Sequence, residues 1–216
     1  MRRLLDILYH LNVQANRTDM RRSREEAAQT RQRIIEAASQ RFRENGIAET
    51  GLNDLMKAAG LETQGGFYKH FESKDELIEE AIGSGVAEIL GRLEDSVKGT
   101  SPEDTFAAMV SNYLSVKHRD HRSHSCPFSA MGTELGRLEG RNAKAAAVGL
   151  KKLIALVAAQ IKDVSTEQAR NRATAAVSAM VGALLLSRIA DNTHWANTIL
   201  AETRKLILSE ERCRER

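Results

Sequence analysis

The chain contains few prolines, cysteines and aromatic residues for its length. Only two prolines and two cysteines occur among 216 residues, and Phe, Trp and Tyr together make up 4%. So few prolines favour long helices, and the apolar alternation that is typical of strands occurs nowhere. Two cysteines cannot form the disulfide framework of a small secreted protein. We therefore expect an all-α protein of a reducing compartment, the cytoplasm.

Other absences exclude classes of function. The chain has no uninterrupted run of eighteen apolar residues, so no membrane-spanning helix is expected. It has no phosphate-binding glycine loop, no nucleophile–base constellation and no His-x-x-x-His pair, so the sequence predicts neither an enzyme nor a cofactor. His118, His121 and His124 are spaced by three, but Arg119 and Arg122 would repel a cation there. We expect no metal site at these histidines.

The net charge of +3 is distributed unevenly along the chain. Residues 1–70 contain 12 Lys and Arg against 9 Asp and Glu, whereas residues 71–216 contain 20 of each. The whole excess therefore lies in the N-terminal third. This placement favours a positive face that meets the phosphates of a nucleic acid, with an ordinary solvated face as the alternative.

Three short helices with glycine-marked turns are predicted between residues 31 and 71. The first repeats apolar residues every four positions, at Ile34, Ala38 and Phe42. The second repeats them at helical spacing, at Leu52, Leu55, Met56 and Ala59. Gly60 supplies the left-handed turn after it, and Thr63 is the expected N-cap of a third helix that reaches Phe71. Two helices joined by a short glycine turn describe a helix-turn-helix, whose second helix enters the major groove of DNA.

The same stretch resembles the TetR/AcrR family of transcriptional regulators over roughly fifty residues. The matching residues are Ala38, Phe42, Gly46, Thr50, Leu55, Ala58-Ala59-Gly60-Leu61, Thr63, Gly65-Gly66-Phe67-Tyr68, Phe71, Ser73-Lys74 and Leu77. The trailing Tyr-x-x-Phe-x-Ser-Lys run makes the match specific, because a helix-turn-helix alone does not require it. The resemblance implies a dimer that binds a palindromic double-stranded DNA operator and is released by a small-molecule effector.

Candidate DNA-binding residues follow from the helix-turn-helix and from this resemblance. Gln64 can pair bidentately with adenine, and Gly65 and Gly66, which lower helix propensity, indicate a close approach of backbone to the duplex. Phe67 and Phe71 are expected to pack inward. The full predicted set is Arg31, Arg33, Thr50, Thr63, Gln64, Gly65, Gly66, Tyr68, Lys69, His70 and Lys74.

The rest of the chain predicts a helical bundle. Two serines are expected to open helices with capping boxes, Ser73 with Glu76 and Ser165 with Gln168. Proline is expected at the first position of two other helices, at Pro102 and Pro127. The expected helices cover residues 74–98, 102–117, a segment from 127, 142–162, 166–190 and 193–209. The polar segment 118–125 is expected to be a loop.

We expect four parts along the chain. Residues 1–25 form an N-terminal extension, 26–73 the helix-turn-helix domain, 74–210 the ligand-binding and dimerisation bundle, and 211–216 a tail. Met20 opens a stretch that would be a natural start for such a regulator. We therefore expect the extension to be mobile or outside the native product, with an arm that lies on DNA or on the protein as the alternative.

The resemblance implies roles for two further groups of residues. Its ligand pocket maps onto Phe106, Met109, Tyr113, Phe128, Met131 and Leu135, although each of these could be ordinary core. Its dimer interface uses the last two helices. Small and apolar residues there suit a close helix contact, namely Ala175, Ala179, Ala183, Trp195 and Ile199.

Cys126 is the one residue with a candidate redox role. It precedes Pro127 at the start of a helix, where the helix dipole and nearby Arg122 and His124 could lower the thiol pKa. A buried, unreactive cysteine is the favoured interpretation. The sequence thus predicts a ligand-responsive repressor, with a DNA-bound scaffold for a protein partner and a thiol-based sensor as alternatives.

Overall fold

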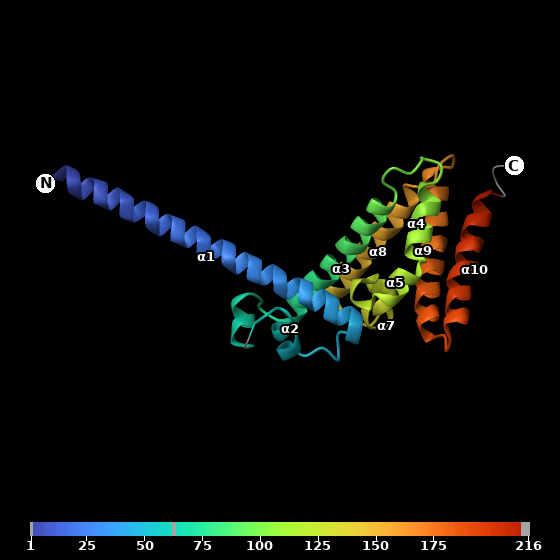
Figure 1. The fold of residues 1–216 in the computed structure, drawn as a ribbon, viewed down its shortest axis with the longest axis horizontal. Coiled ribbons are helices and arrows are strands. Elements are labelled where there is room, and N and C mark those ends of the chain that lie inside the picture. The colour runs from blue at the N-terminus through green and yellow to red at the C-terminus, as the bar shows by residue number, and fades with distance from the viewer. Residues whose placement is uncertain (1, 62–63, 213–216) are drawn as a thin grey trace.

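The computed structural model describes residues 2–61 and 64–212. Side chains are described for residues 23–61 and 66–209. Every element in these ranges is a helix (Figure 1), so the all-α fold is confirmed. In chain order the elements are α1 (Arg2–Asn45), α2 (Leu52–Ala58), the 3₁₀ helix η1 (Gln64–Lys69), α3 (Lys74–Ser96), α4 (Thr105–Tyr113), α5 (Val116–Asp120), the 3₁₀ helix η2 (Arg122–His124), α6 (Pro127–Ala130), α7 (Gly132–Leu135), α8 (Gly140–Ala158), α9 (Thr166–Ile189) and α10 (Thr193–Arg212).

The N-terminal core forms where α1, α2 and η1 meet the first half of α3. The predicted stripe of Ile34, Ala38 and Phe42 is completely buried there, and so is Leu55 of α2. The same apolar cluster also takes in Met131 and Leu135 of the α6–α7 segment, and Ala146 of α8. This core therefore extends across residue 73, where the sequence predicts a domain boundary.

A second core holds the bundle together. It lies between the second half of α3 and helices α4, α8, α9 and α10. Leu90 of α3 and Phe128 of α6 pack against both cores. In Figure 1, α3 runs from the helix-turn-helix into the bundle, and α9 and α10 lie side by side at the end opposite the long arm of α1. Because α3 contributes residues to both cores, a displacement in either core would shift α3.

Helix α1 is much longer than the helix-turn-helix requires. It continues without interruption from Arg2 to Asn45 and projects far from the body (Figure 1). The expectation that residues 1–25 form a mobile extension remains a prediction, and side chains before residue 23 lie outside the described part. The tail at 213–216 lies outside it as well.

Most of the predicted helix ends agree with the structure. Ser165 accepts a hydrogen bond from the backbone N–H of Gln168 while Gln168 accepts one from Ser165, so this capping box is confirmed. Ser73 likewise caps α3 by accepting from the N–H of Glu76. The Glu76 carboxylate, however, accepts from the N–H of Glu72 rather than of Ser73. Gly60 and Gly99 have the positive φ angles that end α2 and follow α3.

Two helix predictions are wrong. The helix expected over 102–117 begins at Thr105 rather than at Pro102 and is divided into α4 and α5. The segment 118–125, expected to be a loop, contains the end of α5 and all of η2. The break follows Tyr113, and Ser115 caps α5 by accepting from the N–H of His118. The third helix of the helix-turn-helix is a short 3₁₀ helix rather than an α-helix to Phe71. Two adjacent glycines in six residues cost about 1 kcal/mol each in α-helix propensity, which explains its brevity.

Helix α9 is long and apolar enough by composition to cross a membrane. It is the one such helix in the part of the chain that the structure describes. Eight of its residues are buried against the bundle, and a capping box fixes its start. A core helix passes the same test of length and composition, and the packing of α9 against α8 and α10 is that of a core helix.

Candidate nucleic-acid interface

Helix η1 presents an exposed tyrosine and an exposed lysine, and two buried phenylalanines anchor this segment to the core. Phe67 and Phe71 are buried, and their rings stack with centroids 5.3 Å apart. Tyr68 meets the edge of Phe67 at 5.2 Å, yet 71% of its surface is exposed. Lys69 beside it is exposed too. The inward packing of the two phenylalanines is confirmed, and Tyr68 and Lys69 are left free to meet a ligand.

The start of η1 can be described only in part. Thr63 lies outside the described residues, and for Gln64 and Gly65 the backbone alone is described. A Cβ atom added at Gly66 would lie 3.5 Å from Met56 Cε, an ordinary van der Waals distance. Packing inside the protein therefore does not demand glycine at position 66. Close approach to a partner remains the predicted reason for it.

Arg31 is engaged inside the protein rather than presented to DNA. Its guanidinium lies 4.5 Å from the ring centroid of Phe71 and donates to Glu76 at 2.8 Å and also to Glu80. It donates to the carbonyl of His70 as well. The hydrogen bonds that Arg31 donates to Glu80 raise the pKa of its guanidinium. The predicted phosphate role for Arg31 is corrected to a structural one, because it joins α1, the segment after η1 and α3.

Thr50 and Lys74 also differ from expectation. The side chain of Thr50 is 1% exposed, and its hydroxyl donates to the carbonyl of Gly46 at 2.6 Å, so it cannot reach a duplex. The Nζ atom of Lys74 donates to the carbonyls of Thr50 at 2.9 Å and Ile47 at 3.2 Å. This lysine thereby ties the start of α3 to the loop before α2. One of its three ammonium hydrogens is left for a phosphate.

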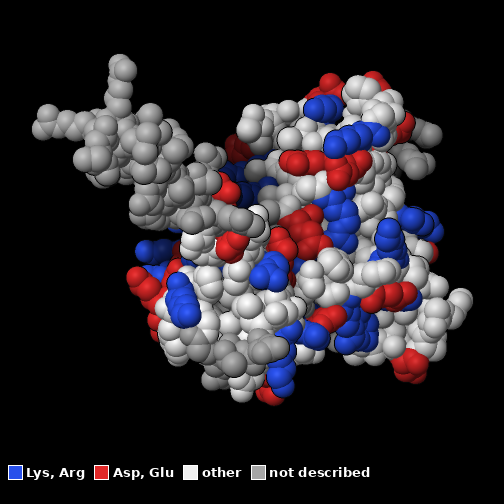
Figure 2. Space-filling view, turned by 60° about the vertical axis from the view of Figure 1, so that its left-hand side comes forward, with Lys and Arg blue, Asp and Glu red and all other residues white. Residues whose placement is uncertain are grey.

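The remaining predicted contacts lie around this segment. Arg33 is exposed on α1 and donates to the hydroxyl of Thr30. His70 is half-buried, and burial together with Arg31 and Lys69 lowers its pKa. In the view of Figure 2, blue and red side chains are interspersed over the surface rather than gathered into one basic patch. On this face, the described part of the chain thus offers individual contacts rather than a broad positive field.

An arginine joins the helix-turn-helix to the bundle at a point that the sequence did not reveal. Arg43 of α1 is 3% exposed, and its guanidinium donates to Glu88 of α3 at 2.6 Å and to the carbonyl of Ser125 at 3.0 Å. The hydroxyl of Ser125 accepts a further hydrogen bond, from Arg188 of α9 at 2.5 Å. Buried charge of this kind is stable only when it is paired. Arg43 and Ser125 therefore link α1, α3 and α9.

A second link comes from α7. The Glu134 carboxylate accepts hydrogen bonds from the backbone N–H groups of Ile47 at 2.9 Å and Ala48 at 3.0 Å. These groups follow Gly46, whose φ of +91° turns the chain after α1. A side chain of the α6–α7 segment thus fixes the loop between α1 and α2. Neither spacing nor composition marks Glu134 for this role in the sequence.

The six residues predicted to line a ligand pocket are divided between a cavity and the two cores. Phe106 lines a cavity of about 210 Å³, together with Ile161 and residues of α9 and α10 that include Arg172 and Ala176. The others belong to the packed interior: Met109 and Tyr113 are in the bundle core, Met131 and Leu135 are in the N-terminal core, and Phe128 lies between the cores. A ligand pocket formed by these residues stays a prediction.

The predicted lowering of the Cys126 thiol pKa is wrong. Cys126 is completely buried, and this burial raises its pKa even though Tyr113 and two backbone N–H groups act in the opposite direction. The nearby His118 is buried too. Its Nδ1 donates to the carbonyl of Tyr113 at 2.7 Å, and its Nε2 accepts from the N–H of Cys126 at 3.0 Å. Cys126 is thus a packing residue, in line with the favoured interpretation.

The three histidines point to separate partners. His121 Nδ1 bonds the carbonyl of Lys117, and His124 Nδ1 bonds Glu88 at 2.7 Å. His118 is engaged on both nitrogens, as described above. Among the residues with described side chains, no group of His, Cys, Asp and Glu is arranged to hold a metal ion.

Large apolar side chains remain exposed near the end of α9 and along α10. They are Leu185 (41% exposed), Leu186 (54%), Ile189 (69%), Trp195 (54%) and Leu206 (60%). The residues of the predicted dimer interface differ in exposure. Ala175 is exposed, and Ala179 and Ile199 are half-buried. Ala183 is buried within its own protomer. Ala183 therefore cannot meet a partner, because it faces the bundle core.

Two family models match the chain, one in each part. The model for "Bacterial regulatory proteins, tetR family" matches residues 34–81. The model for "Transcriptional regulator LmrA/YxaF-like, C-terminal domain" matches residues 102–200. The first match covers α2 and η1 and runs from within α1 into α3. The second covers most of the bundle.

Relatives and solved structures agree with these models. The HTH-type transcriptional regulator TtgR of Pseudomonas putida is 45% identical over 65 residues, which are 30% of each chain. The HTH-type transcriptional regulator AcrR of Shigella flexneri is 34% identical over 89 residues, 41% of this chain and 40% of that one. The chain thus matches less than half the length of these curated relatives.

The likeness to solved structures extends over most of the fold. A TetR transcriptional regulator from Chloroflexus aurantiacus has a TM-score of 0.69 at 22% identity, over 85% of this chain and 96% of that one. The reduced form of NemR from E. coli has a TM-score of 0.67 at 19% identity, over 82% and 96%. At these identities the likeness concerns the fold. With its N-terminal and C-terminal parts both matched, the chain belongs to the TetR family.

Proposed function

We propose that this protein is a DNA-binding transcriptional repressor that acts as a homodimer and is released from its operator by a small molecule. The observation that carries the proposal is the exposed pair Tyr68 and Lys69 on η1, supported from below by the buried Phe67 and Phe71. Tyr68 is 71% exposed and Lys69 beside it is exposed as well, so this segment presents an aromatic and a cationic side chain together. In a helix-turn-helix, the second helix is the one that enters the major groove.

The dimer is supported by the exposed apolar residues of α9 and α10. Leu186, Ile189 and Trp195 are each more than half exposed although the helices carrying them are otherwise packed. A two-fold pairing of these helices would bury them and would also present two η1 helices to successive turns of DNA. Recognition helices of such dimers stand about 34–36 Å apart.

Release by an effector is supported by the contacts that cross between the two cores. Arg43 links α1 to Glu88 of α3 and to Ser125, and Glu134 of α7 holds the loop after α1. A molecule that enters the bundle and shifts α3 or α7 would move the helix-turn-helix with it. Such a ligand weakens DNA binding only if it prefers the shifted conformation.

Selection of binding sites from random DNA duplexes tests the proposal. The purified protein should enrich a palindromic sequence, and its affinity for that duplex should fall steeply with salt. Variant Tyr68→Ala should bind the enriched duplex more weakly by about 1–3 kcal/mol. Enrichment of no sequence at all, with the protein folded and dimeric, would contradict the proposal.

The effector is tested separately from the operator. A compound that raises the melting temperature of the free protein should release the enriched duplex over the same concentration range. A DNA-bound scaffold for a protein partner would instead keep its duplex in the presence of every stabilising compound. The two functions thus predict opposite results in the same titration.

A further inference from the structure

A second cavity, of about 350 Å³, opens where α5 and η2 meet the end of α9 and the start of α10. Charged and polar side chains line it, among them Arg119, Asp120, Arg122, Arg188, Asp191 and Thr193. We call it the arginine cavity. Its volume lies at the lower end of the range of about 300–1,000 Å³ that is typical of small-molecule sites. It shares no lining residue with the cavity beside Phe106.

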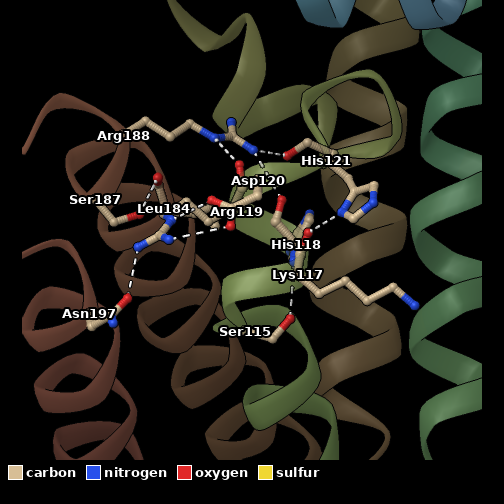
Figure 3. Close-up of polar contacts among 11 residues, drawn as sticks. Ser115, Lys117, His118, Arg119, Asp120, His121, Leu184, Ser187, Arg188 and Asn197 are labelled. Carbon is tan, nitrogen blue, oxygen red and sulfur yellow. Dashed lines mark hydrogen bonds and ion pairs between the residues drawn. The ribbon is translucent and has the colours of Figure 1, made fainter. Parts of the chain in front are cut away.

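Arg188 enters this cavity without a carboxylate partner. Its Nε donates to the carbonyl of Arg119 at 3.1 Å, and its Nη2 donates to the carbonyl of His118 (Figure 3). The same Nη2 donates to the Ser125 hydroxyl. All three acceptors are uncharged. Burial and the nearby Arg122 lower the pKa of Arg188, which means that its charge is under-compensated. A guanidinium in such surroundings is stabilised by an anion.

The other charged groups leave an excess of positive charge. Arg119 is paired with Asp120 at 2.7 Å and also donates to Asn197 of α10. Asp191 accepts from the side-chain amide of Asn192. Arg122 is exposed, and its guanidinium has no hydrogen bond or ion pair with any residue whose side chain is described. Two arginines without carboxylate partners, Arg122 and Arg188, thus face one unpaired carboxylate, that of Asp191, so the cavity carries one excess positive charge.

The lining also favours a ligand with hydroxyl groups. Thr193 contributes a hydroxyl group to the wall, and the Ser187 hydroxyl, which donates to the Leu184 carbonyl, keeps lone pairs that can accept from a ligand. Asn192 accepts from the N–H of Trp195 at the start of α10, whose first turn contains no acidic residue. The positive end of this 20-residue helix therefore adds to the potential of the cavity. Lys117 points away from the cluster in Figure 3 and takes no part.

We propose that the arginine cavity binds a small hydroxylated monocarboxylate, whose carboxylate is held between Arg188 and Arg122. A single negative charge matches the excess charge of the lining, whereas a phosphate dianion would exceed it. The guanidinium of Arg122 suits a carboxylate because it offers two parallel N–H donors. Arg188 can add a donor through Nη1, since its Nε and Nη2 already bond the protein. The proposal concerns the bundle alone and does not depend on DNA binding.

Isothermal titration of the full chain with gluconate tests this proposal. Sorbitol is the matched neutral control, because it has the same carbon chain without the carboxylate, and inorganic phosphate is the control for anions in general. The ionic strength is held constant, since salt screens exposed charges. We expect saturable binding of gluconate, no binding of sorbitol, and weaker binding of phosphate.

Two substitutions tie the binding to this cavity. Arg188→Gln should weaken gluconate binding by about tenfold or more, because it removes a charged hydrogen-bonding partner. Arg122→Glu should weaken it to a similar extent by reversing the excess charge, and the side chain that it replaces is exposed. Arg170→Glu, eighteen residues earlier on α9 and about 27 Å away along the helix, is the matched control and should bind gluconate normally.

The results that would overturn the proposal are distinct. No heat of binding for gluconate with the folded wild-type chain would refute the site. Equal binding of sorbitol, or tighter binding of phosphate, would refute the ligand class. Should Arg188→Gln prove unfolded by circular dichroism, Arg122→Glu decides alone, and normal binding by that variant would refute the assigned location.

Discussion

At the scale of single residues, His118 is held neutral by burial and by the hydrogen bond that its Nε2 accepts. Its Nδ1 hydrogen is donated to the Tyr113 carbonyl, and its Nε2 lone pair accepts from the N–H of Cys126. A proton on Nε2 would remove the second bond and add a charge beside Arg92, Arg188 and Arg43. Burial, with a further contribution from these arginines, lowers the pKa of His118 to about 3.

This pKa makes stability depend on pH. The unfolded chain takes up a proton on His118 near pH 6.5, whereas the folded chain resists it down to about pH 3. As far as His118 is concerned, the free energy of unfolding is therefore highest above pH 6.5 and falls progressively as the pH falls toward 3. Between pH 7.5 and 5.0 we expect a loss of about 2 kcal/mol from this residue. Denaturant unfolding of wild type and His118→Gln at both pH values measures it, and an equal loss in the variant would contradict this origin.

Lys74 presents a choice between a structural role and a phosphate contact. Its ammonium donates to the carbonyls of Ile47 and Thr50, so replacement leaves these two acceptors without their partner. Lys74→Met, which keeps the apolar stem, should lower the free energy of unfolding by about 1–3 kcal/mol. Urea unfolding provides the value. Unchanged stability, together with a salt slope for DNA binding that is shallower by about one, would instead indicate a phosphate contact alone.

At the scale of elements, η1 combines a fixed base with an exposed face. Phe67 and Phe71 secure it to the N-terminal core, and the guanidinium of Arg31 covers the Phe71 ring. Tyr68 and Lys69 contribute little to this packing. Their function can therefore be tested without disturbing the fold.

Replacement of Tyr68 should separate binding from stability. Tyr68→Ala should change the free energy of unfolding by no more than about 0.5 kcal/mol, because the side chain is 71% exposed. Its affinity for the enriched duplex should nevertheless fall by about 1–3 kcal/mol, as measured by fluorescence anisotropy. Val116→Ala, an exposed apolar residue of α5, is the control. Wild-type affinity in Tyr68→Ala would mean that η1 is not the reading element.

Periodicity and helix caps in the sequence predict several of these elements. Apolar spacing locates α2 and the C-terminal part of α1, and the capping serines locate the starts of α3 and α9, because helix ends depend on local hydrogen bonds. Periodicity fails at residues 114–125. There α5 and η2 are short, and buried polar bonds of His118 and Ser125 rather than an apolar stripe hold the segment.

The residues of the candidate site are predictable only in part. The exposed Tyr68 and Lys69 follow from the motif, whereas Arg31 and Thr50 are engaged internally. Such engagement depends on carboxylates and carbonyls distant in sequence. The same reason hides Glu134 and Arg43, whose partners lie 87 and 82 residues away. Local pattern cannot reveal a contact whose other half belongs to a different helix.

At the scale of the whole molecule, assembly is proposed to depend on the exposed end of α9. Ile189 is 69% exposed, so a charge there should leave the protomer folded but prevent two α9–α10 pairs from meeting. We expect Ile189→Glu to be a monomer by light scattering and to bind the enriched duplex much more weakly. Val148→Glu, on α8 and 49% exposed, should remain a dimer. An intact dimer in Ile189→Glu would move the interface elsewhere.

The most direct test of the central claim is a footprint on the DNA that adjoins the protein's own gene. The proposed dimer should protect two half-sites whose centres are about one helical turn, 10–10.5 base pairs, or a multiple of it apart. At the same protein concentration, Tyr68→Ala and Ile189→Glu should each leave both half-sites open to cleavage. Two-half-site protection by wild type that is lost in both variants is the predicted result. Protection that persists in Tyr68→Ala, or the absence of any protected segment with wild type, would contradict the account.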